Sequence, residues 1–281
     1  RSQHWNTSEW RINMSKKCKV HFIGINGSGA SAAALIAKKH GYIVTGCDTK
    51  EKGYYTSQLI SENIEIFAGH NVSHVQNADV VAASPAVILT NNEEIALARK
   101  QGKLCTWQQF IGTYILKNKK VIAVAGTHGK STTTALMSVV LKKNSFSPNA
   151  LMGAIYQEWN GGYLYGDSDY FVIEADEYNR NFHNYTPSIA MIVNIEMDHP
   201  EYYTSYEEML DAYVDFVLKL KDEKILILNV DSQGVRDLLM KLKDKNEMKE
   251  IRVITYSGVS KAEGEIQYTI IKPTIENTKY E

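Results

Sequence analysis

The sequence predicts an α/β protein with two domains, each built around a parallel sheet. Short apolar runs alternate with helical patterns along the chain, which is typical of parallel strands joined by covering helices. Two of these apolar runs end in glycine-rich turns, at residues 24–29 and 126–129, just before a helical pattern. A chain of 281 residues is long enough for two domains of ordinary size.

Composition and charge exclude several classes of protein. Hydrophobic residues make up 44% of the chain and charged residues 22%, as in globular proteins, and the net charge is −1. We therefore expect no binding to nucleic acid and no membrane insertion, because no apolar run approaches the length of a membrane span. The three cysteines are scattered and form no CxxC pair. They fit a reducing cytoplasm and exclude a four-cysteine zinc site, so we expect a cytoplasmic protein.

The domain boundaries follow from polar segments. Residues 1–13 are polar and unpatterned, and we interpret them as a tag, a wrongly assigned start or a disordered arm. Asn118-Lys119-Lys120 forms a polar joint ahead of a strongly apolar run. We therefore expect a first domain over residues 14–117 and a second over residues 118–281.

The first domain begins with the pattern of a nucleotide-binding βαβ unit, which predicts a Rossmann-like parallel-sheet domain. The unit begins with a strand at 19–25 and a glycine turn at 24–29, and a helix follows at 30–40. A second strand at 42–47 then ends at the acid Asp48. The dinucleotide fingerprint G-x-G-x-x-G fails, because Asn26 stands where its second glycine belongs. The spacing alone leaves open a nicotinamide site, a uridine-nucleotide site and a purely structural turn.

Ligands of parallel sheets gather at the carboxyl ends of the strands. The domain continues with strands expected at 64–67, 79–83 and 104–107 and helices expected at 57–63, 93–101 and 108–116. The candidate ligand residues that follow expected strands are Gly27, Gly29, Asp48, His70 and Ser84. A surface-loop histidine explains His70 equally well, and a plain turn explains Ser84-Pro85-Ala86 almost as well.

The second domain opens with a phosphate-loop pattern, which predicts a P-loop ATPase-type α/β central domain. A buried strand at 121–125 leads into Gly126-Thr127-His128-Gly129-Lys130-Ser131-Thr132, and a helical pattern runs from 132 to 143. The glycines let backbone N–H groups approach an anion, and the helix start adds positive dipole. Lys130 is expected to reach the terminal phosphates, and Ser131 to bind Mg²⁺. The standard Walker pattern would need glycine at Val124, so an incidental glycine-rich turn is the alternative.

Two groups of polar side chains follow later strands of this domain. A strand at 169–173 runs into Glu174, Asp176 and Glu177, and a strand at 188–193 ends in Asn194-Ile-Glu-Met-Asp-His199. Crowded carboxylates need a neutralising cation, and oxygen ligands suit Mg²⁺, so one Mg·ATP site is the economical interpretation. Solvated acidic loops are the alternative. The other expected features are strands at 148–152, 224–228, 251–256 and 264–272 (the last in an antiparallel extension), helices at 205–220 and 234–243, and a turn at Gly161-Gly162.

The stretch from Ala125 to Thr134 resembles the ATP loop of the Mur ligase family, the cytoplasmic ATP-dependent amide-forming enzymes of peptidoglycan synthesis. Asn194-Ile-Glu-Met-Asp-His199 and Glu174-Ala-Asp-Glu177 are similar to two further family motifs. Gly24-Ile-Asn-Gly-Ser-Gly29 is similar to the turn that receives the UDP-sugar, apart from Asn26 and the following Ala30. The resemblance covers residues 19–271 and two of the family's three domains, so we expect the C-terminal amino-acid-binding domain to be absent from this chain.

The resemblance implies ATP-dependent ligation of L-alanine to UDP-N-acetylmuramate through an acyl phosphate, with ATP and two Mg²⁺ ions as cofactors. The alternatives are a murein tripeptide recycling ligase, whose motif shares Tyr178, and a non-catalytic nucleotide-binding fragment. An oxidoreductase built on the first βαβ unit is a rival from another class. The implied catalytic residues are Lys130, Glu174 and His199, and the implied metal ligands are Ser131, Glu174 and His199. The implied ATP-binding residues are Gly126, Thr127, His128, Gly129, Lys130, Ser131 and Thr132. The implied substrate-binding residues are Gly27, Ser28, Gly29, Asp48, His70, Ser84, Asp176, Glu177 and Asn194.

Overall fold

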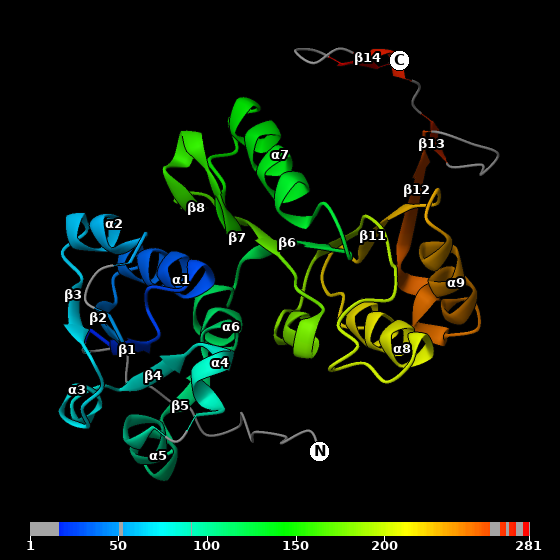
Figure 1. Cartoon of the computed structure of the whole chain (residues 1–281). Coiled ribbons are helices and arrows are strands. Elements are labelled where there is room, and N and C mark those ends of the chain that lie inside the picture. The colour runs from blue at the N-terminus through cyan, green and yellow to red at the C-terminus, as the bar shows by residue number, and fades with distance from the viewer. Residues whose placement is uncertain are drawn as a thin grey trace. The chain divides into compact units, whose positions relative to one another are not determined.

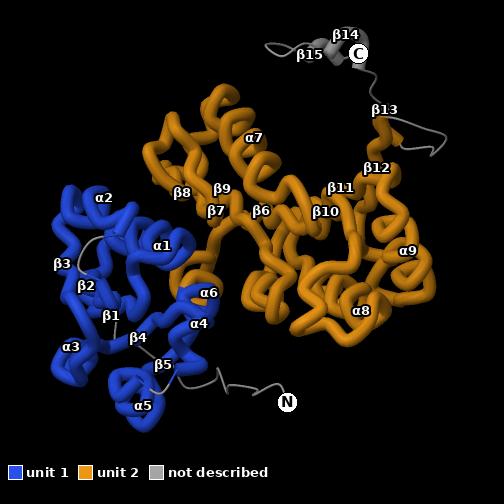
Figure 2. The backbone as a smooth tube through the Cα atoms, in the orientation of Figure 1, with its two compact units in different colours: residues 1–110 blue, residues 111–281 orange. Residues whose placement is uncertain are grey.

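The chain forms two compact units, residues 1–110 and residues 111–281 (Figure 2). The computed structural model describes residues 17–50, 53–90, 92–258, 265–267, 270–273 and 278–280, so the expected arm at 1–13 lies outside the described residues. The division falls a few residues before the boundary expected after residue 117. Gly112 packs within the second unit, where an added Cβ would lie 2.1 Å from the carbonyl oxygen of Asn184.

The first unit contains a parallel sheet with the strand order β3-β2-β1-β4-β5 (Figure 1). The strands are β1 (Lys19–Ile23), β2 (Ile43–Asp48), β3 (Glu65–Ala68), β4 (Val80–Ala83) and β5 (Leu104–Thr106). The helices are α1 (Ser28–Lys39), α2 (Thr56–Ser61), α3 (Ser73–Gln76), α4 (Pro85–Ile88), α5 (Glu93–Lys100) and α6 (Trp107–Phe110). This is the parallel α/β arrangement that the sequence predicts.

Small side chains pack α1 against this sheet. Eight consecutive residues, from Ala30 to Ala37, are buried, and most of them are alanines. Such small residues let a helix lie close to a sheet. Ser84 begins a short helix, because its hydroxyl accepts a hydrogen bond from the Val87 N–H and caps α4. The helix expected at 108–116 is divided into α6 and a π-helix, Ile111–Ile115.

The second unit contains a larger sheet, whose described strands have the order β13-β12-β11-β10-β6-β9-β7-β8. The strands are β6 (Lys120–Ala125), β7 (Asn149–Tyr156), β8 (Gly161–Leu164), β9 (Tyr170–Glu174), β10 (Ile189–Ile192), β11 (Ile225–Asn229), β12 (Arg252–Ser257) and β13 (Ile266–Gln267). Only β8, within this described sheet, runs antiparallel to its neighbour. The helices are α7 (Lys130–Lys143), α8 (Tyr206–Val217) and α9 (Gln233–Leu242).

Two expectations for this unit are wrong. Gly161 and Gly162 begin β8 instead of forming a turn, and the chain reverses through the 3₁₀ turn Gln157–Trp159 and Asn160, whose φ of 51° is left-handed. The single late strand expected at 264–272 has two described parts, and β13 pairs in parallel with β12, contrary to the expected antiparallel extension. Residues 270–272 belong to β14 (Ile270–Pro273), which does pair antiparallel, with β15 (Thr278–Tyr280).

The amphipathic helix α8 packs one face in the core of the second unit. Ser205 caps it by accepting a hydrogen bond from the Glu208 N–H, and Met209, Tyr213 and Phe216 are buried on one face. The helix expected at 205–220 therefore contributes one face to the core. Among the described residues, no helix combines the length and the apolar character needed to cross a membrane.

Candidate functional site

Three strands of the second unit deliver the candidate functional residues to one edge of the sheet. Strand β6 lies between β9 and β10 and is parallel to both. Their carboxyl ends therefore lie together, as expected for ligand sites in parallel sheets. The loop 126–129 follows β6, the acids 174–177 follow β9, and the segment 194–199 follows β10. Stretches that are separate in the sequence thus meet in one place.

The loop after β6 requires glycine at two positions. Gly126 has a φ of 144°, and an added Cβ would lie 2.9 Å from the carbonyl oxygen of Asn194. Gly129 has a φ of 79° and caps α7. Helix α7 starts at Lys130, two residues before the expected start at 132. The loop therefore leads directly into a helix N-terminus, where unpaired N–H groups and the helix dipole favour an anion.

The segment after β10 braces this loop. The Asn194 side chain accepts a hydrogen bond from the His128 N–H at 2.8 Å and donates one to the His128 carbonyl at 2.9 Å. The Thr127 hydroxyl donates to the Glu196 carbonyl at 3.0 Å and accepts from the Glu196 N–H at 2.9 Å. The Thr127 N–H donates to the Asn194 carbonyl at 3.1 Å. These contacts fix the loop without a ligand, and they occupy both polar atoms of the Asn194 amide.

Lys130 points back into the loop. Its ammonium donates to the carbonyls of Gly126 at 2.7 Å and Thr127 at 3.1 Å, and it lies 3.0 Å from Glu177 Oε2. Only 14% of its side chain is exposed, so the ammonium lies within the loop and not in solvent. The cause is Glu177, a fully buried carboxylate that requires a cationic partner. Burial raises the pKa of the Glu177 carboxyl, and the Lys130 charge opposes that rise.

Two of the predicted metal ligands lie in contact. The Ser131 hydroxyl donates to Glu174 Oε2 at 3.0 Å, and the Gly153 N–H donates to the same oxygen at 2.8 Å. A hydroxyl and a carboxylate at this separation are hard oxygen ligands of the kind that Mg²⁺ prefers. A cation that bound both would replace the hydrogen bond between them.

The third predicted metal ligand, His199, lies in a separate group with Asp176 and Glu177. One ligand atom from each of these three residues lies within 4.8 Å of the others. His199 Nε2 is 3.9 Å from Glu177 Oε1, and its backbone has a φ of 55°. The ring of Tyr178 packs on the imidazole with the centroids 4.8 Å apart. The donor set fits a divalent cation, because two carboxylates and an imidazole surround one point.

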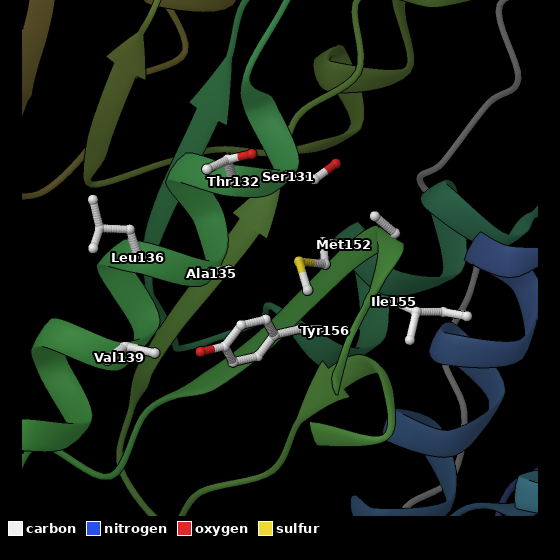
Figure 3. A pocket seen from close by; sticks show the side chains of 9 residues that line it. Ser131, Thr132, Ala135, Leu136, Val139, Met152, Ile155 and Tyr156 are labelled. Atoms are coloured by element: carbon white, nitrogen blue, oxygen red, sulfur yellow. The ribbon is translucent and has the colours of Figure 1, made fainter. Parts of the chain in front are cut away.

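A pocket of about 350 Å³ extends from the phosphate loop between α7 and β7 (Figure 3). Its lining residues are Ser131, Thr132, Ala135, Leu136, Val139, Met152, Ala154, Ile155 and Tyr156. Leu136 is 62% exposed, although its spacing along the helix resembles a core position, because α7 packs on the sheet through smaller residues such as Ala135. Sequence reasoning did not find this pocket, since nothing local marks which apolar side chains remain uncovered.

The candidate ligand residues of the first unit lie at the strand ends where they were expected. Gly24, with a φ of 78°, would place a Cβ 3.0 Å from the Ser84 hydroxyl, so the turns after β1 and β4 meet where the strand order reverses. Asp48 accepts a hydrogen bond from the Asn26 N–H at 2.9 Å and thereby holds the glycine turn. A Cβ at Gly29 would lie 2.5 Å from the Trp107 ring, so a larger residue there would require the ring to move.

Two further residues of this unit have different surroundings. Ser28 is exposed and starts α1 directly after the glycine turn. His70 follows β3, and its Nδ1 lies 2.9 Å from Glu94 Oε2. One nitrogen of the His70 ring is therefore already used inside the protein.

Comparison with known protein families finds two matches along the chain. Residues 19–115 match the Mur ligase family catalytic domain, and residues 124–280 match the Mur ligase middle domain. A UDP-N-acetylmuramate–L-alanine ligase from Caldicellulosiruptor saccharolyticus is 36% identical over 246 residues, covering 87% of this chain and 52% of that protein. The enzyme of the same name from Pelotomaculum thermopropionicum is 38% identical, covering 80% of this chain and 49% of that protein. The chain thus spans about half the length of the curated relatives it matches.

Solved structures show the same similarity. The UDP-N-acetylmuramate–alanine ligase from Thermotoga maritima aligns with a TM-score of 0.73 and 28% identity, covering 90% of this chain and 54% of that one. The UDP-N-acetylmuramate:L-alanyl-γ-D-glutamyl-meso-diaminopimelate ligase from Neisseria meningitides aligns with a TM-score of 0.76 and 25% identity. That alignment covers 89% of this chain and 83% of the other chain.

Proposed function

The chain belongs to the Mur ligase family, and we propose that it carries the ATP-binding and first-substrate-binding parts of an ADP-forming ligase that joins L-alanine to UDP-N-acetylmuramate. The observation that carries this proposal is the meeting of the loop 126–129 with the acids after β9 and β10 at one sheet edge. Phosphate and divalent cations are the ligands that such a meeting accommodates. The names of the relatives in the comparison support the choice of substrates, and the product would serve peptidoglycan precursor synthesis.

In the second unit we assign the loop 126–132 to the phosphates of ATP. The α7 N-terminus and the loop N–H groups face the anion, and Lys130 exchanges the carbonyls of Gly126 and Thr127 for phosphate oxygens. ATP supplies the phosphoryl group that activates the muramate carboxylate as an acyl phosphate for attack by the alanine amine. The protein's part is to hold charge and position at the loop, which is the main contribution of proteins to phosphoryl transfer.

We assign the cations to two groups of side chains. Ser131 and Glu174 hold one Mg²⁺ beside the loop, and Asp176, Glu177 and His199 hold a second. The support is the 3.0 Å contact within the first group and the 4.8 Å clustering within the second. Asn194 and Thr127 keep the loop in place, so their contribution to ATP binding is positioning.

In the first unit we assign the UDP-sugar to the crevice at the carboxyl ends of β1 and β4. The N-terminus of α1, with Gly27, Ser28 and Gly29, faces the pyrophosphate, and Asp48, His70 and Ser84 surround it. Asn26 in the glycine turn disfavours a nicotinamide dinucleotide. We therefore expect UDP-N-acetylmuramate, and not NAD⁺, to raise the melting temperature of the chain.

One observation favours a second candidate, a ligase that recycles murein peptides. The Neisseria ligase, whose name includes the peptide L-alanyl-γ-D-glutamyl-meso-diaminopimelate, aligns with a TM-score of 0.76, slightly above the 0.73 of the alanine ligase from Thermotoga. The two candidates share the ATP and UDP-sugar sites and differ in the amine that they accept. Competition between L-alanine and the tripeptide L-alanyl-γ-D-glutamyl-meso-diaminopimelate in a ligation assay on the full-length enzyme would separate them.

Calorimetric titration with ATP at several Mg²⁺ concentrations tests the ATP and metal assignments. We expect Glu174→Gln to require at least ~10-fold more Mg²⁺ for the same ATP affinity, because the loop then lacks a charged ligand. Glu247→Gln, at an exposed acid in the 3₁₀ turn Asn246–Glu250, is the matched control and should behave as wild type. If Glu174→Gln showed the Mg²⁺ dependence of wild type, the acids after β9 would be a solvated loop and not a metal site.

A further inference from the structure

The first unit contains a group of side chains that the proposed ligase reaction does not use. His21 on β1, Cys47 on β2, His74 on α3 and Glu94 on α5 each place one ligand atom within 4.8 Å of the others. His21, Cys47 and Glu94 are buried, and the His74 side chain is 13% exposed. These are two imidazoles, a thiol and a carboxylate around a single point in the protein interior.

The fold builds this group from four separate elements. Strands β1 and β2 are neighbours with the register His21↔Thr45 and Ile23↔Cys47. Because side chains alternate along a strand, His21, Thr45 and Cys47 point to the same face of the sheet. Helices α3 and α5 contact each other and bring His74 and Glu94 to that face (Figure 1). The sequence does not show the group, since His21, Cys47, His74 and Glu94 are widely spaced along the chain.

His21 carries an unpaired buried nitrogen. Its side chain is fully buried, and its Nδ1 lies 2.8 Å from the Thr45 hydroxyl. Its Nε2 has no hydrogen-bond partner among the described residues. A donor bond from Nδ1–H to Thr45 would leave a lone pair on Nε2, which is the form of histidine that binds a metal. Buried polar atoms without a partner are uncommon in folded proteins, so this nitrogen indicates a missing ligand.

Glu94 lies at the centre of the group. It is fully buried and accepts a hydrogen bond from the Asn71 N–H at 2.9 Å. His74 Nδ1 lies 2.7 Å from Oε1, and Cys47 Sγ lies 3.3 Å from Oε2. A buried carboxylate requires compensation by protons or by a cation. A thiolate and a carboxylate together carry the charge that a divalent cation balances, with the imidazoles neutral.

We propose that His21, Cys47, His74 and Glu94 form a four-coordinate Zn²⁺ site in the first unit. Nitrogen, sulfur and carboxylate ligands in a tetrahedral set are the usual environment of zinc. Mg²⁺ requires oxygen ligands and an octahedral shell, so this site and the proposed magnesium ligands of the second unit select different metals. On binding, Cys47 loses its thiol proton to solvent and its sulfur bonds to the metal, with no change of oxidation state.

The proposed site connects to the substrate crevice through two residues. Cys47 immediately precedes Asp48, and Glu94 also contacts Nδ1 of His70 at 2.9 Å. A metal that draws Glu94 toward the imidazole of His21 changes the partner of His70. Zinc would therefore fix β1, β2, α3 and α5 to one another and set the orientation of His70 at the end of β3.

Metal analysis of the purified chain tests the proposal. We expect about one zinc per chain after exposure to Zn²⁺ and removal of excess, and a Zn²⁺-dependent rise in melting temperature. Replacing Zn²⁺ with Co²⁺ should give the intense near-ultraviolet charge-transfer absorption of a cobalt–thiolate bond. Cys47→Ser should lose that absorption and bind Zn²⁺ more than ~100-fold more weakly, since even losing a second-shell partner costs up to that factor.

Two further variants make the result decisive. Cys105→Ser alters a cysteine on β5 that is not among the four ligands, so it should keep the zinc and the absorption. His74→Asn, at the partly exposed ligand, should lose zinc affinity even if Cys47→Ser fails to fold. The absence of zinc and of the cobalt absorption in the wild type would overturn the proposal. Wild-type zinc affinity in folded Cys47→Ser or His74→Asn would also overturn the proposal. The four side chains would then form only a hydrogen-bond network that exchanges protons.

Discussion

At the scale of single residues, Lys130 and Glu177 form a pair with two tasks. The ion pair stabilises the loop, and we also assign the Lys130 ammonium to the ATP phosphates. Lys130→Met should destabilise the protein by about 3–5 kcal/mol, because it leaves the buried Glu177 carboxylate without a cation. Lys130→Met combined with Glu177→Gln should recover most of that loss, since no uncompensated charge remains.

The double variant separates stability from binding. Urea unfolding measures the first quantity, and calorimetric titration with Mg·ATP measures the second. We expect the double variant to be stable but to bind ATP at least ~10-fold more weakly than Glu177→Gln alone, a reference that already lacks the carboxylate assigned to the second Mg²⁺. Lys142→Met, an exposed lysine in the last turn of α7, is the control for the loss of a positive charge from the helix. An ATP affinity in the stable double variant equal to that of Glu177→Gln would contradict the phosphate role of Lys130.

The same pair predicts a pH dependence. Burial raises the pKa of Glu177 above its ordinary value of 4.5, and removing Lys130 removes the charge that opposes the rise. An acid with a raised pKa binds its proton more tightly in the folded state, so stability falls as pH rises through the interval between the two pKa values. Lys130→Met should therefore approach the stability of the double variant below the ordinary pKa and fall behind it above the raised pKa. If the difference in unfolding free energy between Lys130→Met and the double variant stayed constant between about pH 4 and about pH 8, Glu177 would not be the group responsible.

The two loop glycines should differ in their tolerance of a side chain. In Gly129→Ala the new side chain has its nearest contact 3.8 Å away, so only the left-handed φ is unfavourable. This variant should lose about 1–2 kcal/mol of stability. Gly126→Ala also meets the Asn194 carbonyl at 2.9 Å, so it should cost more and displace the loop. Thermal unfolding of both variants measures the difference. Equal losses of stability in the two variants would mean that the loop 126–129 and the segment after β10 move apart at no energetic cost.

At the scale of elements, the brace between the β10 segment and the phosphate loop can be tested alone. Asn194→Ala removes two hydrogen bonds to the His128 backbone and should cost about 1–3 kcal/mol of local stability. Hydrogen exchange at the His128 amide should become at least ~10-fold faster. Asn144→Ala, which removes one hydrogen bond at the end of α7, should leave that exchange rate unchanged.

The order of strands and helices could be predicted from local patterns, because each apolar run and each glycine turn is contained in a short window. The loop 126–129 and the acids after β9 and β10 could be predicted to share an edge, since parallel strands place their carboxyl ends together. The partner of Lys130 could not, because contact with Glu177 depends on side-chain direction across neighbouring strands. The cluster of His21, Cys47, His74 and Glu94 was missed for the same reason. Gly161 was misread because the positive φ of the turn falls on Asn160 instead.

At the scale of the whole molecule, each unit has its own sheet and its own proposed ligand. The first unit would hold the UDP-sugar at the switch point of its sheet, and the second would hold Mg·ATP at the edge formed by β6, β9 and β10. The two ligands should therefore each stabilise the chain when added alone. Catalysis requires a more exact geometry than binding does, because the carboxylate, the phosphate and the amine must lie within attack distance of one another.

We predict that a polypeptide of residues 1–281 binds both ligands without turning them over at an ordinary rate. The relatives in the comparison are about twice as long as the part that this chain matches, and a misplacement of ~1 Å at a reacting centre can cost ~100-fold in rate. An acyl phosphate also requires protection from water, which lids and closing domains usually provide. The assay supplies ATP, Mg²⁺, UDP-N-acetylmuramate and L-alanine to the purified polypeptide and measures phosphate release and the mass of the ligated product. Product at ~1 s⁻¹, the low end of ordinary enzyme turnover, would show that these two units suffice for the reaction.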